Sequence, residues 1–209
     1  MSCVPTWGEP AVYGAVVRVF VAGASGAIGR RLVPLLVGAG HTVAGMTRHA
    51  DRAPLLEDAG AHAVVCDVYD IASLEAAVVA FAPDAVVHQL TALPDARASI
   101  AEFAAANNRV RREGTHNLLR AAAAARARRF LAQSVAWQLP GDGGVAVAAL
   151  ERAVLTAGGV VLRYGQFFGP GTYYEAEPPP PPRIHVDEAA RRTVELLDSP
   201  RGIIVVARG

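Results

Sequence analysis

Three glycines near the N-terminus have a spacing that suits the binding of phosphate groups. Residues 22–29 read Ala-Gly-Ala-Ser-Gly-Ala-Ile-Gly and directly follow a short run that is typical of a strand. Gly23 permits a tight turn, Gly26 lets the backbone approach a pyrophosphate, and Gly29 lets a following helix pack closely on a sheet. The N–H groups of the first helical turn would face the phosphates. This context predicts a dinucleotide-binding loop, with a purely structural turn as the alternative. Its predicted cofactor-binding residues are Gly23, Ser25, Gly26, Ala27, Ile28 and Gly29.

An arginine follows the second predicted strand, where NAD-binding folds usually place an acidic residue about 20 residues after the loop. The strand covers Thr42–Met46, and Arg48 comes just after it. An arginine there suits the 2′-phosphate of NADP, and Arg30, Arg31 and Arg52 could add positive charge. The sequence therefore predicts that NADP(H) is favoured over NAD(H). The alternative is an arginine that only faces solvent.

Two further cofactor candidates, Asp67 and Val68, follow the third predicted strand, Ala63–Cys66. A carboxylate at this place can hydrogen-bond an adenine. The alternative is that Asp67 caps the helix predicted to begin at Ile71.

The chain contains no lysine, because all 20 of its basic residues are arginine. This excludes a Schiff-base lysine, a phosphate-loop lysine and any Tyr-x-x-x-Lys pair. Any acid–base chemistry must use other side chains.

Three residues at the ends of predicted strands are the catalytic candidates. Ser134 ends the fifth strand and could orient a substrate by a hydrogen bond. Tyr164 follows the sixth strand and could donate a proton, although a tyrosine without a nearby cation keeps a pKa near 10. His88 ends the fourth strand and titrates in the useful range. Packing is the alternative for Tyr164, and a hydrogen-bonded wall residue is the alternative for His88. Tyr173 and Tyr174 are weaker candidates on a loop.

Strand and helix patterns alternate along the chain and must position these residues. Short apolar strands between amphipathic helices predict βαβ units and a parallel sheet buried on both faces. Right-handed crossovers then give a doubly wound, Rossmann-like α/β fold. The predicted strands are Val16–Val21, Thr42–Met46, Ala63–Cys66, Ala85–His88, Arg129–Ala132, Val160–Leu162, Arg183–Val186 and Ile203–Val206. The predicted helices are Leu32–Val37 with a kink at Pro34, Arg52–Ala59, Ile71–Phe81, about Ile100 to Ala125, Ala146–Ala157, and one capped by Asp187 that ends at Leu197.

The predicted organisation is an N-terminal tail, residues 1–14, followed by one nucleotide-binding domain, residues 15–209. Residues 165–185 are rich in proline and glycine, and five consecutive prolines, 178–182, forbid a helix. Gly169–Gly171 and the proline run mark a loop without regular structure, which ends where the predicted strand Arg183–Val186 begins. A stiff connector is the favoured interpretation of the proline run, and a partner-binding segment is the alternative.

The ordered set of motifs resembles the extended short-chain dehydrogenase/reductase superfamily, in its NAD-dependent epimerase/dehydratase branch. The resemblance rests on residues 22–29, 87–91, 114–119, 162–171 and 185–189. It implies a nicotinamide over the carboxyl ends of the strands, with Gln89 and Leu90 among the cofactor-binding residues. It also implies that Ser134 hydrogen-bonds a substrate carbonyl or hydroxyl, and that the late His185 is structural.

The chain departs from this family where catalysis would occur. The family's proton donor is a tyrosine with a lysine four residues later. Counted back from Glu151, which resembles the family's helix glutamate, these places hold Gly143 and Val147. The C-terminal substrate lobe is also much reduced.

Composition excludes several other classes of protein. The formal net charge is +1 and the charges are mixed, so we expect no nucleic-acid partner. No apolar run reaches the ~20 residues of a membrane span, and no signal peptide is apparent at the N-terminus. Cys3 and Cys66 are far apart, which favours a reducing compartment. We therefore expect a cytoplasmic protein, and the alanine and arginine bias hints at a bacterial one.

Three functions fit these observations. The first is an atypical NADP(H)-dependent oxidoreductase or epimerase that acts on a small carbonyl or hydroxyl compound. The second is a non-redox cyclase, isomerase or dehydratase of a natural-product pathway. The third is a catalytically silent protein that senses NADP. The first is preferred, with a small-molecule substrate, no metal and an oligomeric state that the sequence does not give.

Overall fold

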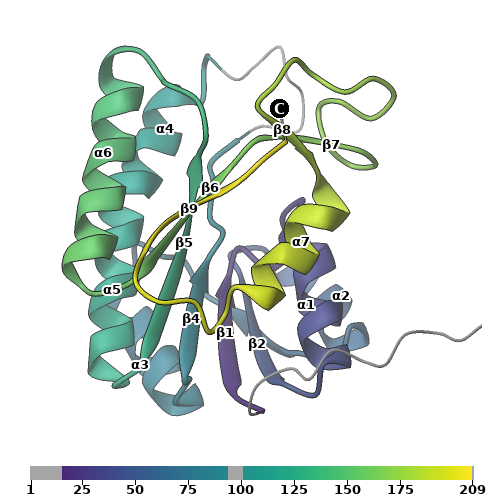
Figure 1. Cartoon of the computed structure of the whole chain (residues 1–209). Helices are drawn as coiled ribbons and strands as arrows, with labels where there is room; N and C mark the ends of the chain where they lie inside the picture. The colour runs from purple at the N-terminus through teal and green to yellow at the C-terminus, as the bar shows by residue number, and fades with distance from the viewer. Residues whose placement is uncertain (1–15, 94–100, 209) are drawn as a thin grey trace, which may run out of the picture.

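The computed structural model describes residues 16–93 and 101–208, and its centre is a seven-stranded parallel sheet with helices on both faces (Figure 1). The strand order is β3-β2-β1-β4-β5-β6-β9, so the predicted doubly wound α/β fold is confirmed. The predicted tail, residues 1–14, lies outside the described residues. The strands are β1 Arg18–Ala22, β2 Thr42–Thr47, β3 His62–Val65, β4 Ala85–His88, β5 Arg129–Val135, β6 Val160–Tyr164 and β9 Gly202–Val206.

Alternating side chains of the strands supply two cores, one on each face. Val19 and Val21 of β1 pack on one face, and Phe20 packs on the other. Helices α1 and α7 cover the first face, and α3, α5 and α6 cover the second (Figure 1). Each fully buried apolar side chain stabilises the fold by roughly 1.5–3 kcal/mol. The helices are α1 Gly29–Gly38, α2 Ala53–Asp58 after a 3₁₀ turn at Ala50–Arg52, α3 Ile71–Phe81, α4 Ala104–Arg109, α5 Thr115–Ala124, α6 Gly141–Thr156 and α7 Val186–Glu195.

The predicted long helix is divided by a π-helical turn. Val110–Gly114 has π-helical hydrogen bonding and joins α4 to α5. Such turns are rare and are often found at functional sites. The helix α1, in contrast, continues through Pro34 to Gly38.

The proline-rich segment is bordered by two short strands. β7, Gln166–Phe168, pairs in parallel with β8, Arg183–His185, to form a small second sheet. β8 confirms the predicted strand at Arg183–Val186, whereas β7 was not predicted. The prediction that Asp187 caps the next helix was wrong. His185 is the N-cap of α7, and its Nδ1 accepts a hydrogen bond from the N–H of Asp187. The Asp187 carboxylate instead pairs with Arg31 of α1. Among the described residues, no helix has the length and apolar character to span a bilayer.

Candidate functional site

The predicted cofactor residues follow four strands that are neighbours in the sheet. The glycine loop follows β1, Arg48 follows β2, Asp67 and Val68 follow β3, and Gln89 and Leu90 follow β4. Because these strands lie side by side in the order β3-β2-β1-β4, the residues form one track along the carboxyl edge of the sheet. Open α/β sheets bind ligands along this edge, where the strand order reverses.

Two glycines of the loop are required by close packing. Gly23 has a φ of +87°, and a Cβ there would lie 2.7 Å from the carbonyl oxygen of Gln89. A Cβ on Gly29 would lie 2.3 Å from the carbonyl oxygen of Gly23. Gly26 is different, since a Cβ there would meet only the Gly23 oxygen, at 3.3 Å. The fold itself therefore explains Gly23 and Gly29, and explains Gly26 only weakly.

The first turn of α1 has features of an anion site. Its N-cap, Ile28, supplies no side-chain hydrogen bond, and its first turn contains no acidic residue. The N–H groups of Arg30 and Arg31 already donate to the carbonyl oxygens of Gly26 and Ile28, so it is the positive end of the helix dipole that favours a negative ligand here. The loop is further held by a 3.0 Å hydrogen bond between the hydroxyls of Ser25 and Thr47.

Of the arginines near the loop, Arg48 is well placed to meet a ligand. It is exposed at the end of β2, and its Nε lies 3.0 Å from Nε2 of His49. Arg31 is already engaged, because it binds the Asp187 carboxylate and the carbonyl oxygens of Ala27 and Pro170.

The segment after β3 shows which aspartate caps the next helix. Asp70, not Asp67, caps α3, because its Oδ1 accepts from the N–H of Ser73 at 3.1 Å. The capping alternative for Asp67 is therefore excluded. The Asp67 side chain is exposed and accepts from the N–H of Tyr69 at 2.9 Å, and the neighbouring Val68 is buried.

A chain of hydrogen bonds with one fixed direction begins at Gln89. The Thr193 hydroxyl donates to the carbonyl oxygen of Ala189 at 2.6 Å. Its only proton is thus used, so the Tyr164 hydroxyl, 2.6 Å away, must donate to Thr193. The Tyr164 oxygen then accepts from Nε2 of Gln89 at 3.3 Å. This order fixes the orientation of the Gln89 amide.

This series of hydrogen bonds leaves one buried acceptor without a partner. Gln89 is 4% exposed, and its Oε1 has no hydrogen-bond partner in the described structure. A buried polar atom without a partner is costly, so such an atom calls for an explanation. A ligand that donates a hydrogen bond would provide one.

Tyr164 itself is poorly suited to proton transfer. It is buried, its proton is committed to Thr193, and burial raises its pKa to about 12. The structure therefore favours the packing alternative for this residue. Its catalytic role remains a prediction with little support.

His88 is also fully engaged by the protein. Its Nδ1 accepts from the N–H of Leu90 at 3.2 Å, which leaves its proton on Nε2, 3.0 Å from the Thr115 hydroxyl. Burial lowers the pKa of His88 to about 4. The imidazole is thus neutral near pH 7, and the wall-residue alternative is favoured.

Ser134 lies in a buried ionic cluster that sequence reasoning missed. Its hydroxyl donates to Oε1 of Glu151 at 2.6 Å, and Arg163 makes two hydrogen bonds to the same carboxylate, at 2.8 and 2.6 Å. Burial raises the pKa of the Glu151 carboxyl, but these hydrogen bonds outweigh it and hold the pKa below its ordinary value. Because its proton is used, Ser134 can accept a hydrogen bond from a ligand but cannot donate one.

The place of the family's tyrosine is distant from this cluster along α6. Gly143 lies eight residues before Glu151, which is about two helical turns or roughly 12 Å. Ser134, which is hydrogen-bonded to Glu151, is therefore about two helical turns from Gly143 along the axis of α6. Glu151 was recognised in the sequence only as a landmark, and its pairing with Arg163 could have been suspected only once β5 and β6 were known to be neighbours. Among the described residues, no group of three or more His, Cys, Asp or Glu side chains is placed to hold a metal ion.

Comparisons with known proteins agree with this fold. The model of the NAD dependent epimerase/dehydratase family matches residues 19–142. A 3-diazoavenalumate denitrifying reductase from a Streptomyces species is 42% identical over 181 residues, which is 75% of this chain and 58% of that protein. The chain thus spans little more than half the length of that relative.

Solved structures resemble the fold at lower identity. The UDP-glucose 4-epimerase of Thermus thermophilus, in complex with NAD, matches with a TM-score of 0.75 and 21% identity, over 92% of this chain and 78% of that chain. The Bordetella bronchiseptica enzyme WbmG, also in complex with NAD, matches with a TM-score of 0.76 and 20% identity, over 95% and 74%.

Proposed function

Because this chain belongs to the NAD dependent epimerase/dehydratase family, we propose that it is a reductase that uses NADP(H) to replace a diazo group by hydrogen. The observation that carries the proposal is that the three predicted proton-handling groups, Ser134, Tyr164 and His88, are all buried and committed to protein partners. The support comes in two parts, the fit of the cofactor and the absence of a free proton donor among these three groups.

The residues of the track fit a dinucleotide. Gly26 leaves room beside the uncapped first turn of α1, where a pyrophosphate would bind. Oε1 of Gln89 offers a buried acceptor to a donor on the nicotinamide half, such as a ribose hydroxyl or the carboxamide. Asp67 would accept from the adenine. The dinucleotide would fill the room at Gly26 and would donate to the open acceptor of Gln89.

The preference for NADP(H) is proposed from Arg48. A charge-assisted hydrogen bond contributes roughly 1.5–3 kcal/mol, which corresponds to roughly ten- to a hundredfold in affinity. We therefore expect Arg48→Ala to weaken NADPH binding by about that factor and to leave NADH binding unchanged, as measured by calorimetry. Equal losses for both cofactors would remove the reason for the preference. Arg201→Ala, an exposed arginine that precedes β9 at the opposite edge of the sheet, serves as the control for general charge.

The proposed reaction follows from what the chain's own residues cannot do. A bound NAD(P)H supplies a hydride. Reduction of a carbonyl requires, in addition to the hydride, a proton on the carbonyl oxygen. When a hydride replaces a diazonium group, a C–H bond forms and N₂ leaves with the electron pair of the C–N bond. The second reaction needs no proton from Ser134, Tyr164 or His88. The denitrifying reductase at 42% identity supports the same choice. A diazonium compound accordingly replaces the carbonyl or hydroxyl substrate expected from the sequence.

The test compares two electrophiles with the purified chain and NADPH. Benzenediazonium should be reduced to benzene with one N₂ released per NADPH oxidised, and benzaldehyde should not be reduced. NADPH oxidation is followed by absorbance and N₂ by mass spectrometry, with corrections for the reaction without protein. Reduction of benzaldehyde alone would contradict the proposal and restore carbonyl chemistry.

A catalytically silent NADP-binding protein is the second candidate, and the same committed protons favour it. It predicts tight NADPH binding with no oxidation by either electrophile. The same assay therefore separates the two.

A further inference from the structure

Arg111 is a partly buried cation for which the described structure provides no carboxylate. It lies on the π-helical turn Val110–Gly114, and its Nη1 donates one hydrogen bond, 3.3 Å long, to Oδ1 of Asn108. Burial lowers the pKa of its guanidinium, and no acidic group of residues 16–93 or 101–208 acts against that shift. The group stays charged near pH 7, because an arginine pKa lies far above that range.

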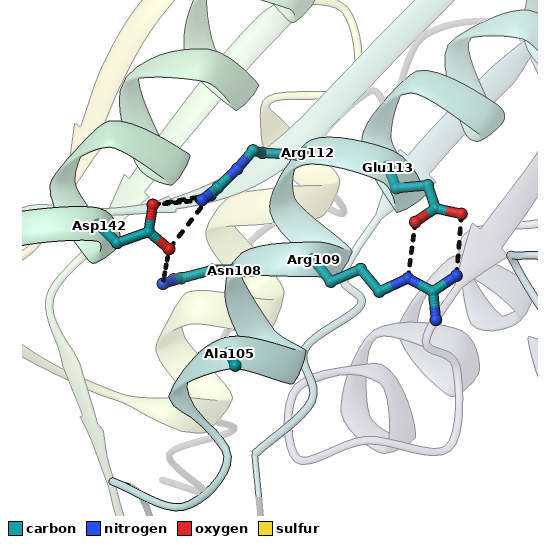
Figure 2. A pocket seen from close by; sticks show the side chains of 6 residues that line it. All are labelled: Ala105, Asn108, Arg109, Arg112, Glu113 and Asp142. Atoms are coloured by element: carbon teal, nitrogen blue, oxygen red, sulfur yellow. Dashed lines mark hydrogen bonds and ion pairs between the residues drawn. The ribbon is translucent and has the colours of Figure 1, made fainter.

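Its neighbours on the same turn are paired. Arg109 makes two hydrogen bonds to the Glu113 carboxylate, and Arg112 binds the Asp142 carboxylate at the start of α6 (Figure 2). These pairs, with Ala105 and Asn108, line an open hollow of about 330 Å³. The turn therefore balances its outward-facing arginines with acids and leaves Arg111 without one.

Arg111 lies on the helix face that is turned to the sheet. Thr115, one turn later, contacts His88 at the carboxyl end of β4. A helix that joins two parallel strands runs against them, so a residue one turn before Thr115 lies beyond the end of β4. This is the edge of the sheet that carries the cofactor track.

Asn108 connects Arg111 with a space beside α6. The same Oδ1 that accepts from Arg111 would lie 4.0 Å from a Cβ on Gly143. That Cβ would meet nothing closer than the Leu139 side chain, at 3.5 Å. Gly143 is the position that the family resemblance assigns to tyrosine. The Arg111 guanidinium is thus hydrogen-bonded to the same Asn108 side chain that borders Gly143, a position without a side chain.

We propose that Arg111 binds the carboxylate of the substrate in the space beside Gly143. The inference rests on the proposed function in taking the cofactor track as the site of hydride transfer. A guanidinium removed from water is costly unless it is paired, and its planar fork matches a carboxylate in bidentate geometry. Arg111 would orient the substrate by this ion pair and would transfer no proton.

The test measures binding of benzoate and of benzamide, its uncharged analogue, to the full chain by ligand-observed NMR. The wild-type protein should prefer benzoate. Arg111→Gln keeps a donor for Asn108 but removes the charge, and it should weaken benzoate binding roughly ten- to a hundredfold and leave benzamide binding unchanged. Arg111→Lys, which keeps the charge but loses the fork, should give an intermediate loss.

Arg109→Gln is the matched control, since it removes a nearby arginine that is paired with the Glu113 carboxylate. It should bind benzoate as the wild type does. Equal benzoate affinity in wild type and Arg111→Gln, an equal loss in Arg109→Gln, or no preference for benzoate in the wild type would each overturn the proposal. Circular dichroism checks that the variants fold. NADPH affinity of Arg111→Gln should equal that of the wild type. If the wild type binds no NADPH, the proposed function fails while the benzoate comparison still decides the role of Arg111.

Discussion

Around the glycine loop, polar groups are left open, whereas along β5 and α6 they bind one another. Oε1 of Gln89 has no partner in the described structure and α1 has no side-chain cap. Ser134, Glu151 and Arg163, by contrast, use their hydrogen bonds within one cluster. An open buried acceptor is costly in the free protein and is compensated when a ligand binds. This contrast supports the proposal that the glycine-loop side of the sheet receives a ligand, whereas the Ser134 cluster stabilises the fold.

The largest expected effect separates two glycines of the loop. Gly29→Ala should lose about 3 kcal/mol of stability, because its Cβ would overlap the Gly23 carbonyl. Gly26→Ala should change stability by under about 1 kcal/mol yet weaken NADPH binding roughly tenfold or more, because the methyl group occupies the space of the pyrophosphate. Thermal unfolding and calorimetry measure the two effects. Full NADPH binding by Gly26→Ala would break the comparison.

His88, at the end of β4, is a second buried group whose hydrogen bonds are all made within the protein. Its contribution to stability can be tested through its pH dependence. Its folded pKa of about 4 lies below its ordinary value of 6.5, so the unfolded state binds its proton first as the pH falls. Stability from this residue is complete above pH 6.5, declines below it, and levels off near pH 4, for a total of about 3 kcal/mol.

His88→Gln should remove that part of the pH dependence, while its amide can still bind Thr115. Urea unfolding at several pH values provides the measurement, with the exposed His62→Gln as control. An unchanged slope between pH 6.5 and 4 would show that His88 is not the titrating group.

Gln89→Leu tests whether the unpaired acceptor of Gln89 binds the cofactor. The change removes an unpaired buried acceptor but also the 3.3 Å hydrogen bond from Gln89 to Tyr164. These effects oppose each other, so the stability of the free protein should change by less than about 1 kcal/mol. NADPH binding should weaken roughly five- to tenfold, and binding of adenosine 2′,5′-bisphosphate, which lacks the nicotinamide half, should not change. The exposed Gln138→Leu is the matched control. A stability loss with unchanged NADPH affinity would mean that Gln89 serves packing alone.

The smallest effect concerns the first turn of α6. Gly143→Ala should stabilise the protein by about 0.5 kcal/mol, because its Cβ has room and alanine favours a helix. The adjacent Gly144→Ala should instead destabilise it, since a Cβ there would lie 2.4 Å from the Leu139 carbonyl oxygen. Thermal unfolding of the two variants compares them directly. Destabilisation by Gly143→Ala would contradict the space proposed beside Arg111.

The sequence predicted the sheet well because strand and helix periodicity are local. β4 and α3 have the predicted bounds. The strand β7 was missed because three residues beside the Gly-Pro-Gly turn have no clear pattern, whereas its partner β8 falls at the predicted strand Arg183–Val186. The N-cap of α7 was misassigned because Asp187 and His185 both suit the start of a helix. The ion pair that occupies the Asp187 carboxylate is made with Arg31 of α1, which is distant in sequence.

The sequence by itself determined the alternating fold, the glycine loop after β1, and the absence of lysine. Only the tertiary structure decided which polar groups remain available. Ser134 meets Glu151 across 17 residues, Tyr164 meets Thr193 across 29, and Gln89 meets Tyr164 across 75. A hydroxyl has one proton to donate, and burial removes the water that would otherwise replace a missing partner. Whether such a group can act on a ligand therefore depends on partners that no local pattern identifies.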